Sequence, residues 1–274
     1  MSEAKRFISL YDEVDARIKE YDDLMKSQVP VVGFPLQVIP GRMNTIVAPS
    51  HSGKTIYGIG LAMTLAREGK KVMLLSTEEG PESFIAKTRE LLARKEEFLK
   101  NITTEYIYQF DKESVLKLMK ELEKENFDHI IIDYFKKSMW KSYSNDHQTM
   151  EEINAAFYNA NQQLDKKLGM FVFVQGNREA FDVDKNALKD LVGNEGKIAL
   201  MIDGGMPAYR TPDNVVFIRR ERGGRKLFVA KSRFNHEELG KIYNYNVDLV
   251  EFKIIVHPEF EDLIEKAPKR RGSV

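Results

Sequence analysis

The sequence contains no cysteine, which excludes a disulfide-bonded scaffold, a thiolate nucleophile and any metal site built on cysteine ligands. It also carries no net charge, because 42 lysine and arginine residues balance 42 aspartate and glutamate residues. Any contact with nucleic acid must therefore come from a local patch. No apolar run approaches the ~18 residues of a membrane-spanning helix, and the N-terminus lacks the apolar core of a signal peptide. These absences predict a soluble, cytoplasmic protein without a membrane partner.

The composition is that of an ordinary globular protein. Of the 274 residues, 42% are apolar and 31% are charged, which excludes collagen-like and largely disordered chains. A chain of this length can bury a sizeable core without a metal or disulfide to stabilise it.

The N-terminal residues 1–29 contain a predicted amphipathic helix over residues 5–26. Its apolar residues recur at spacings of 4 and 3, which places them on one face: Phe7, Tyr11, Val14, Ile18, Tyr21 and Met25. Three heptads are too few for a lone coiled coil, so we expect this face to dock on another surface, in the same chain or in a neighbour. Prolines and glycines then interrupt the helix, and the main domain is expected to span residues 30–258.

From residue 44 onward, apolar runs of strand length alternate with helical patterns. Strands are predicted at 45–49, 71–76, 106–110, 129–133 and 170–175, with helices at 54–68, 81–96, 112–126 and 147–168. Several strands are apolar at successive positions, which is typical of a parallel sheet covered on both faces. The alternation predicts a doubly wound α/β domain with a mostly parallel central sheet.

The C-terminal part of this domain has a different pattern. Residues 214–221 and 225–234 flank a pair of glycines and predict a β-hairpin, and residues 241–257 predict one or two further strands. The remaining residues, 259–274, form a small basic tail.

One motif indicates a phosphate-binding site. Residues 48–55 fit the form [G or A]-x4-G-K-[S or T], with Ala48 in the first position followed by Pro49, Ser50, His51, Ser52, Gly53, Lys54 and Thr55. The motif follows a strand and opens a helix, as a phosphate loop requires. Backbone N–H groups at the helix N-terminus would cradle phosphates. Lys54 would reach the β- and γ-phosphates of ATP, and the Thr55 hydroxyl would ligate Mg²⁺.

Polar residues end three other predicted strands. Asp133 follows four apolar positions and fits the carboxylate that organises Mg²⁺ from the opposite side. Glu78, next to Glu79, can orient and deprotonate an attacking water, and the Gln175 amide can sense the γ-phosphate. The ends of parallel strands lie at one edge of the sheet, where ligands of open α/β sheets bind.

These motifs, in this order, resemble the RecA-like core of DnaB-type replicative helicases over roughly residues 30–250. The run from Gln175 to Arg178, together with Lys231-Ser232-Arg233, is what singles out this family. The resemblance implies a P-loop ATPase in which Lys54 and Thr55 bind phosphate and Mg²⁺, Glu78 is the catalytic base, Asp133 is the second Mg²⁺-side carboxylate and Gln175 is the γ-phosphate sensor. Lys231 and Arg233 would be offered in trans to the nucleotide of a neighbouring subunit.

The resemblance also implies an assembly. Members of the family form rings, so we expect a homo-oligomer, expected to be a hexamer, that moves on single-stranded DNA and meets replication or recombination proteins. Residues 1–29 would then serve as the linker helix that packs on the next subunit. The family's usual N-terminal domain is not part of this sequence, in which about 30 residues precede the core.

Two segments are candidates for the DNA contact. Residues 179–206 hold Lys185, Lys189 and Lys197 but also several acids, so they do not form a basic groove. Residues 136–143 interleave three lysines with Trp140 and Tyr143, the combination of charge and aromatic surface that single-strand binders use.

Two other functions stay open at this point. A RecA- or RadA-like recombinase or recombination mediator of the same fold would form open filaments on DNA, although the N-terminal helix lacks the short Phe-x-x-Ala polymerisation motif of RadA-type recombinases. A nucleotide-gated regulator or loader-like ATPase would use the ATP site as a switch without motor activity, and the neutral charge favours it somewhat.

Overall fold

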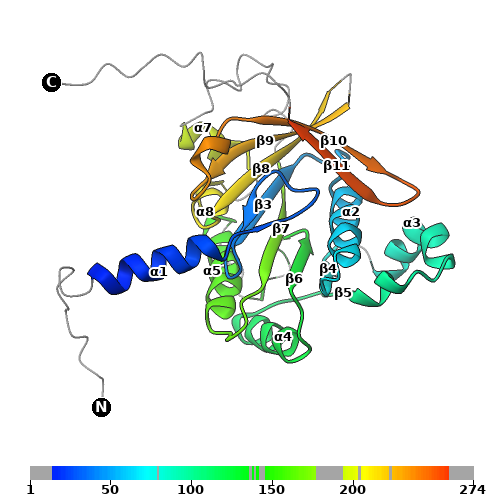
Figure 1. Cartoon of the computed structure of the whole chain (residues 1–274), viewed down its shortest axis with the longest axis horizontal. Coiled ribbons are helices and arrows are strands. Elements are labelled where there is room, and N and C mark those ends of the chain that lie inside the picture. Colours follow the sequence, from blue (N-terminus) through cyan, green and yellow to red (C-terminus); the bar gives the residue numbers. More distant parts are fainter. Residues whose placement is uncertain are drawn as a thin grey trace.

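The computed structural model describes residues 14–78, 80–135, 138, 140–141, 146–176, 194–202, 205–221 and 224–258. Its main feature is a nine-stranded sheet in the order β11-β10-β9-β8-β3-β7-β6-β4-β5 (Figure 1). Six strands run parallel to one another: β8 (Asn214–Glu221), β3 (Met43–Ala48), β7 (Gly169–Gln175), β6 (His129–Asp133), β4 (Val72–Ser76) and β5 (Ile102–Tyr106).

Three antiparallel strands extend this sheet beyond β8. They are β9 (Gly224–Ser232), β10 (Ile242–Asp248) and β11 (Lys253–Pro258). A separate small ribbon pairs β1 (Val29–Pro30) with β2 (Gln37–Val38). The predicted hairpin and both further C-terminal strands are therefore confirmed.

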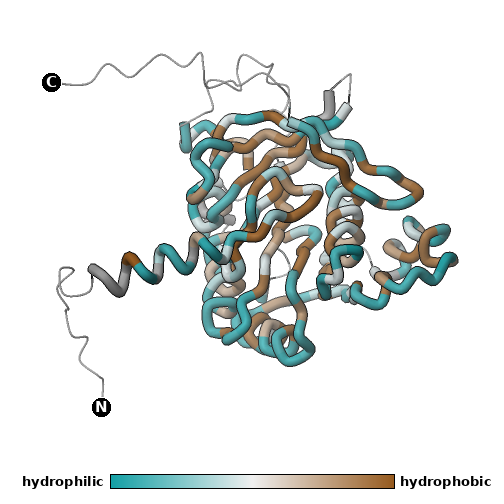
Figure 2. Tube along the Cα trace, in the orientation of Figure 1, coloured by the Kyte–Doolittle hydropathy of each residue, from teal (hydrophilic) through white to brown (hydrophobic). Residues whose placement is uncertain are grey.

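Helices cover both faces of the sheet because its central strands are apolar on both sides. In β6, Ile131 packs into the core beneath α2 (Lys54–Arg67), whereas Ile130 and Ile132 pack into the core beneath α4 (Lys112–Lys124) and α5 (Asp146–Gln162). Figure 2 shows hydrophobic residues along the central strands and a mostly hydrophilic α1. The predicted mostly parallel α/β fold, with helices on both faces, is thus confirmed.

The shorter helical elements lie around this framework. They are α3 (Pro81–Ala93), η1 (Glu97–Asn101), α7 (Glu195–Leu200), α8 (Gly205–Arg210) and η4 (His236–Glu238). Among the described residues, no helix has both the length and the apolar character needed to cross a membrane.

One predicted strand is placed wrongly. The apolar run over residues 106–110 is not a strand; β5 lies at Ile102–Tyr106 instead. β5 is an edge strand with largely exposed residues, so its sequence has no apolar run to mark it. Phe110 is buried for another reason, because it packs on α5 through Phe157 and forms a bridge with Trp140.

The N-terminal helix α1 spans Val14–Lys26 and projects from the body of the molecule (Figure 1). Ile18 and Tyr21, two members of its apolar face, are 55% and 54% exposed. The predicted beginning of this helix, with Phe7 and Tyr11, lies outside the described residues. Within this chain, α1 thus leaves part of its apolar face in solvent.

Candidate nucleotide-binding site

The carboxyl edge of the sheet, formed by the C-terminal ends of the parallel strands, brings the predicted site residues together. Ala48, the last residue of β3, is in register with Gln175 at the end of β7. Ser76, the last residue of β4, is in register with Asp133 at the end of β6. The phosphate loop (residues 48–55) begins at this same edge. Parallel pairing explains why residues far apart in the sequence converge here.

The phosphate loop is a tight turn that opens α2. The Ser52 hydroxyl donates to the Pro49 carbonyl at 2.7 Å, which closes the turn, and the loop contains two left-handed residues, His51 (φ 60°) and Gly53 (φ 96°). The positive φ of Gly53 suits glycine because a Cβ there would be strained. Ala48, at the first position of the phosphate-loop motif, is completely buried, which is compatible with its small side chain. The loop leads directly into the helix N-terminus, which favours bound anions.

Lys54 and Gln175 meet at the centre of the site. The Lys54 ammonium donates to Gln175 Oε1 at 2.5 Å, and Gln175 Nε2 donates to the Ser50 hydroxyl at 2.8 Å. The same ammonium lies 4.1 Å from the centre of the Tyr134 ring. Gln175 therefore links the end of β7 to both the lysine and the tip of the phosphate loop.

A small cavity next to Lys54 has the ligand chemistry for Mg²⁺. Part of its lining offers oxygen donors, namely the Thr55 and Ser76 hydroxyls and the carboxylate of the buried Asp133. These are the hard oxygen donors that Mg²⁺ prefers. Ile59, Leu74 and Phe84 give the cavity apolar surface as well. No cluster of three acidic or histidine side chains is found in the part of the chain that the structure describes. A phosphate-bound Mg²⁺ needs none, because phosphate oxygens and waters complete its coordination. The residues present thus fit the ion.

Glu78 lies two residues beyond β4, exposed at the carboxyl edge. The preceding residue fixes this segment to the end of β6, since Thr77 N–H donates to the Asp133 carbonyl at 3.0 Å and the Thr77 hydroxyl donates to the Tyr134 carbonyl. Glu78 is therefore held beside the strand that carries Asp133. Glu79 lies outside the described residues.

Lys231 and Arg233 lie at the other edge of the sheet. β9 runs antiparallel to β8, and the register places Ser232 opposite Asn214, which itself pairs with Asn44 near the beginning of β3. The phosphate loop follows the end of this six-residue strand, roughly 20 Å away. Lys231 and Arg233 are therefore not brought to the phosphate loop of their own chain.

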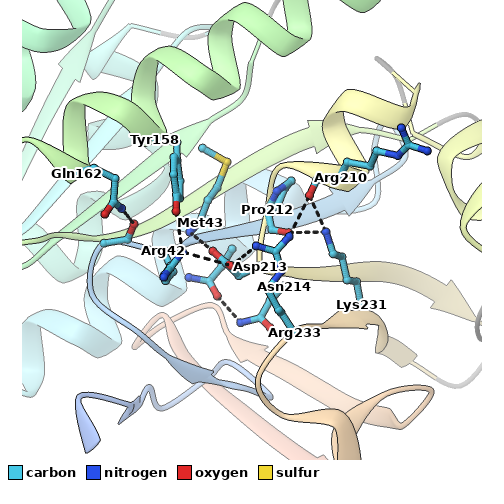
Figure 3. A network of polar contacts seen from close by, with 12 residues as sticks. Arg42, Met43, Tyr158, Gln162, Arg210, Pro212, Asp213, Asn214, Lys231 and Arg233 are labelled. Carbon is cyan, nitrogen blue, oxygen red and sulfur yellow. Dashed lines mark hydrogen bonds and ion pairs between the residues drawn. The ribbon is translucent and has the colours of Figure 1, made fainter. Parts of the chain in front are cut away.

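Asp213 holds Arg233 at this amino edge (Figure 3). The Asp213 side chain is 1% exposed and accepts from Arg233 Nη1 at 3.0 Å and from the Met43 N–H at 3.4 Å. Arg42 Nη1 lies 4.0 Å from the same carboxylate and donates to the Tyr158 hydroxyl at 2.6 Å. The Arg233 side chain is still 47% exposed, so it is fixed at its base and open to solvent at the surface.

Lys231 is held differently. Its ammonium donates to three backbone carbonyls at the end of α8, at 2.6 to 2.8 Å: those of Tyr209, Arg210 and Pro212 (Figure 3). Burial, together with the nearby positive charge of Arg233, lowers the pKa of Lys231 to about 8, against the opposing effect of Asp213. At neutral pH Lys231 thus stays mostly protonated, although its charged form is less favoured than that of an ordinary lysine.

Sequence reasoning missed Asp213, Arg42 and Tyr158. Asp213 is a single acid before a predicted strand, a common turn residue, and its contacts come from positions 170 residues earlier in the chain. No local pattern marks such a residue. The pairing of β3 with β8 brings Arg42 beside Asp213, and Tyr158 contacts Arg42 from α5.

Trp140 is a core residue and not a platform for bases. It is 2% exposed, and its indole Nε1 donates to Glu152 on α5 at 2.7 Å. Lys141 beside it pairs with Asp111, the N-cap of α4. The members of this candidate DNA segment that lie outside the described residues are Lys136, Lys137, Met139, Ser142 and Tyr143. In the other segment, residues 179–193 and 203–204 lie outside them as well.

Replacing Trp140 with alanine should therefore lower stability. A large aromatic removed from a core costs about 3–5 kcal/mol, and here Glu152 also loses the indole donor. Urea unfolding followed by circular dichroism measures the change. Tyr108→Ala is the matched control, because Tyr108 is 78% exposed and its loss should change stability little. A stable Trp140→Ala protein with impaired DNA binding would contradict this assignment.

Comparison with known proteins supports the same fold. No protein-family model and no curated protein matches the chain. Among solved structures, the ATPase domain of G40P matches 91% of this chain and 99% of its own, with a TM-score of 0.63 and 12% identity. A DnaB-like replicative helicase, solved for its interactions with primase, matches 91% of this chain and 67% of its own, with a TM-score of 0.65 and 14% identity. The chain therefore has the RecA-like fold of DnaB-type helicase ATPase domains.

Proposed function

We propose that this protein hydrolyses ATP with Mg²⁺, assembles into a ring, expected to be a hexamer, and moves along single-stranded DNA to unwind a duplex. The observation that carries the proposal is the meeting of Lys54 and Gln175 at the phosphate loop, beside the cavity lined by Thr55 and Asp133. This is the arrangement of a site that holds and senses a triphosphate. The fold shared with helicase ATPase domains supports the proposal that ATP hydrolysis drives movement on DNA.

ATP would bind at the N-terminus of α2. Backbone N–H groups of residues 50–55 hold its phosphates, and the Lys54 ammonium moves from Gln175 to the β- and γ-phosphates. Gln175, released from Lys54, then donates its amide to the γ-phosphate. Thr55 and Asp133 are the residues that would hold Mg²⁺, which neutralises charge on the phosphate oxygens when bound. Gln175 thus reports the state of the site to the segment that follows β7.

Glu78 supplies the base. From its place beyond β4 its carboxylate accepts a hydrogen bond from water and takes its proton as the water attacks the γ-phosphate. The exposure of Glu78 in the isolated chain leaves it accessible to a neighbouring subunit, which would exclude bulk water from the site.

Lys231 and Arg233 act on the nucleotide of the next subunit. Because they lie at the amino edge, they cannot reach the nucleotide site of their own subunit. Arg233 is exposed, and its ion pair with Asp213 fixes the guanidinium as a hydrogen-bond donor. A guanidinium in this position neutralises charge that develops on the transferring phosphoryl group. A phosphate beside Lys231 would raise the pKa of this lysine back toward its ordinary value, because it stabilises the charged ammonium.

The linker helix α1 would join the subunits of the ring. Its exposed Ile18 and Tyr21 need an apolar partner surface. The groove between α4 and α5 is the candidate, because Leu116 and the small residues Ala155, Ala156 and Ala160 give it apolar surface. Its other lining residues are polar or charged: Lys112, Gln148, Glu151, Glu152, Asn159 and Gln163. Small side chains allow close approach of a packed helix. We place α1 of one subunit against this groove of its neighbour.

Tyr21→Asp should dissociate the ring, because it introduces a charge into this apolar contact. Light scattering after size-exclusion chromatography measures the mass of the assembly. Lys19→Asp is the control, since Lys19 is exposed on the same helix but is not part of the apolar face. A Tyr21→Asp protein that stays fully assembled would contradict the role of α1.

The test of the function is steady-state ATP hydrolysis by the purified protein with and without poly-dT. We expect a several-fold rise on DNA, as for a motor that is coupled to its track. A rate indifferent to DNA would instead favour a nucleotide-gated regulator with a replication or recombination protein as its partner. Helical filaments on DNA without strand separation, seen by electron microscopy, would favour a recombinase.

A further inference from the structure

Arg225, near the beginning of β9, lies against the phosphate loop of its own chain. A Cβ placed on Gly53 would lie 3.5 Å from each of Cζ, Nε and Nη2 of Arg225. The guanidinium therefore sits over the loop backbone at the point where α2 begins. No motif in the sequence marks this residue.

The topology explains its position. β8 pairs with β3 only from Asn214 to Phe217, so the rest of the β8–β9 hairpin extends beyond the carboxyl edge of the parallel strands. Arg225 is near the tip of this extension, opposite Arg220 in β8 and opposite Tyr245 in β10. Tyr245 in turn packs on Tyr57 of α2, with ring centres 5.1 Å apart. The hairpin is thereby held against the helix that carries Lys54.

The electrostatics at this point are unfavourable without an anion. A cation at a helix N-terminus opposes the helix dipole, and Lys54 already supplies one charge there. Among the described residues, the guanidinium of Arg225 has no hydrogen-bond or ion-pair partner.

Tyr245 does not compensate this charge. Its hydroxyl is buried and has no hydrogen-bond partner among the residues that the structure describes. Burial raises the pKa of Tyr245 well above its ordinary value, against the opposing effect of the Arg225 charge. The phenol thus stays protonated and provides no counter-ion, so the charge of Arg225 is available to a ligand.

We propose that Arg225 is a second cation of the nucleotide site and binds, in cis, the phosphates held by the phosphate loop of its own subunit. The proposal rests on the proposed ATP-binding function and adds a binding residue to it. It gives β9 two roles. Its beginning, at Arg225, would contact the nucleotide of its own subunit, whereas Lys231 near its end and Arg233 just beyond it would face the nucleotide of the neighbour.

The test is the displacement of a fluorescent ATP analogue from the full-length protein by ATP and by inorganic tripolyphosphate. Arg225→Ala should raise the Kd of both competitors by about tenfold, the usual effect of losing one charge-assisted hydrogen bond. Arg225→Lys should recover part of this loss, because it keeps the charge. Lys226→Ala is the control: it removes the same charge from the next position, on the other face of the hairpin, and should leave both Kd values unchanged.

The possible outcomes distinguish a failure of the proposed ATP-binding function from a failure of the role of Arg225. A wild-type protein that binds neither competitor would overturn the proposed function itself. A wild-type protein that binds both, together with an Arg225→Ala protein of unchanged Kd and melting temperature, would overturn only the role of Arg225. A loss confined to ATP, with tripolyphosphate unaffected, would also overturn it, because the contact would then be with the base or ribose.

Discussion

Lys54→Ala should lower the kcat of ATP hydrolysis about 100-fold or more, the effect of removing one preorganised positive group from a charged transition state. Lys54 is 8% exposed at the start of α2, and its ammonium already makes a short hydrogen bond to Gln175 in the chain without nucleotide. In the variant, Gln175 loses this partner and the phosphates lose their central cation. Steady-state phosphate release measures the effect. Lys120→Ala, which removes an exposed lysine from α4, should hydrolyse ATP at the wild-type rate.

Glu78→Gln separates binding from chemistry at the same site. The amide keeps the size of the side chain but cannot accept a proton from water, so ATP should still bind while turnover is lost. If both Lys54→Ala and Glu78→Gln hydrolysed ATP at the wild-type rate, the assignment of the carboxyl edge as the catalytic site would be wrong.

Arg233→Ala should lower kcat by about 10³-fold, the lower end of the effect of an arginine finger, while the affinity of a subunit for ATP changes little. The reason is positional: Arg233 lies at the amino edge, roughly 20 Å from its own phosphate loop, so its loss leaves that loop intact. Single-turnover hydrolysis and nucleotide binding, measured on the same preparation, give the two quantities.

Arg210→Ala is the matched control for Arg233. Arg210 is exposed nearby, and its backbone carbonyl, which the substitution retains, is what holds Lys231. This variant should keep the wild-type rate. An Arg233→Ala protein that hydrolyses ATP normally would exclude Arg233 from the reaction, and one that fails to bind ATP would indicate a contact in cis.

The site at the carboxyl edge was predictable because its functional residues directly follow or end apolar strands in the sequence. The phosphate loop follows one apolar run, and Asp133 and Gln175 end two others, so a parallel sheet alone requires them to converge. The prediction needed no side-chain detail. The positions of Lys231 and Arg233 at the far edge likewise follow once the C-terminal hairpin is recognised, because its second strand must run in the opposite direction.

Other features depend on register and packing, which the sequence pattern does not contain. Arg225 reaches the phosphate loop only because the β8–β9 hairpin extends beyond the carboxyl edge of the parallel strands. Asp213 meets Arg42 through the pairing of β3 with β8, and it meets Arg233 through the pairing of β8 with β9. Trp140 shows that a local pattern can also mislead. An aromatic residue among lysines is compatible with a nucleic-acid surface and with a core position, and Trp140 is buried in the core. β5 lacks an apolar run because it is an exposed edge strand.

ATP hydrolysis by mixed subunits tests the composite site most directly. Lys54→Ala subunits lack the phosphate-loop cation, and Arg233→Ala subunits lack the donor offered to the neighbour, so each variant should be inactive alone. In an equimolar mixture, about a quarter of the interfaces would combine an intact phosphate loop with an intact Arg233 from the next subunit. We predict that mixing restores roughly this share of the wild-type rate. A mixture no more active than the separate variants would contradict a site completed in trans.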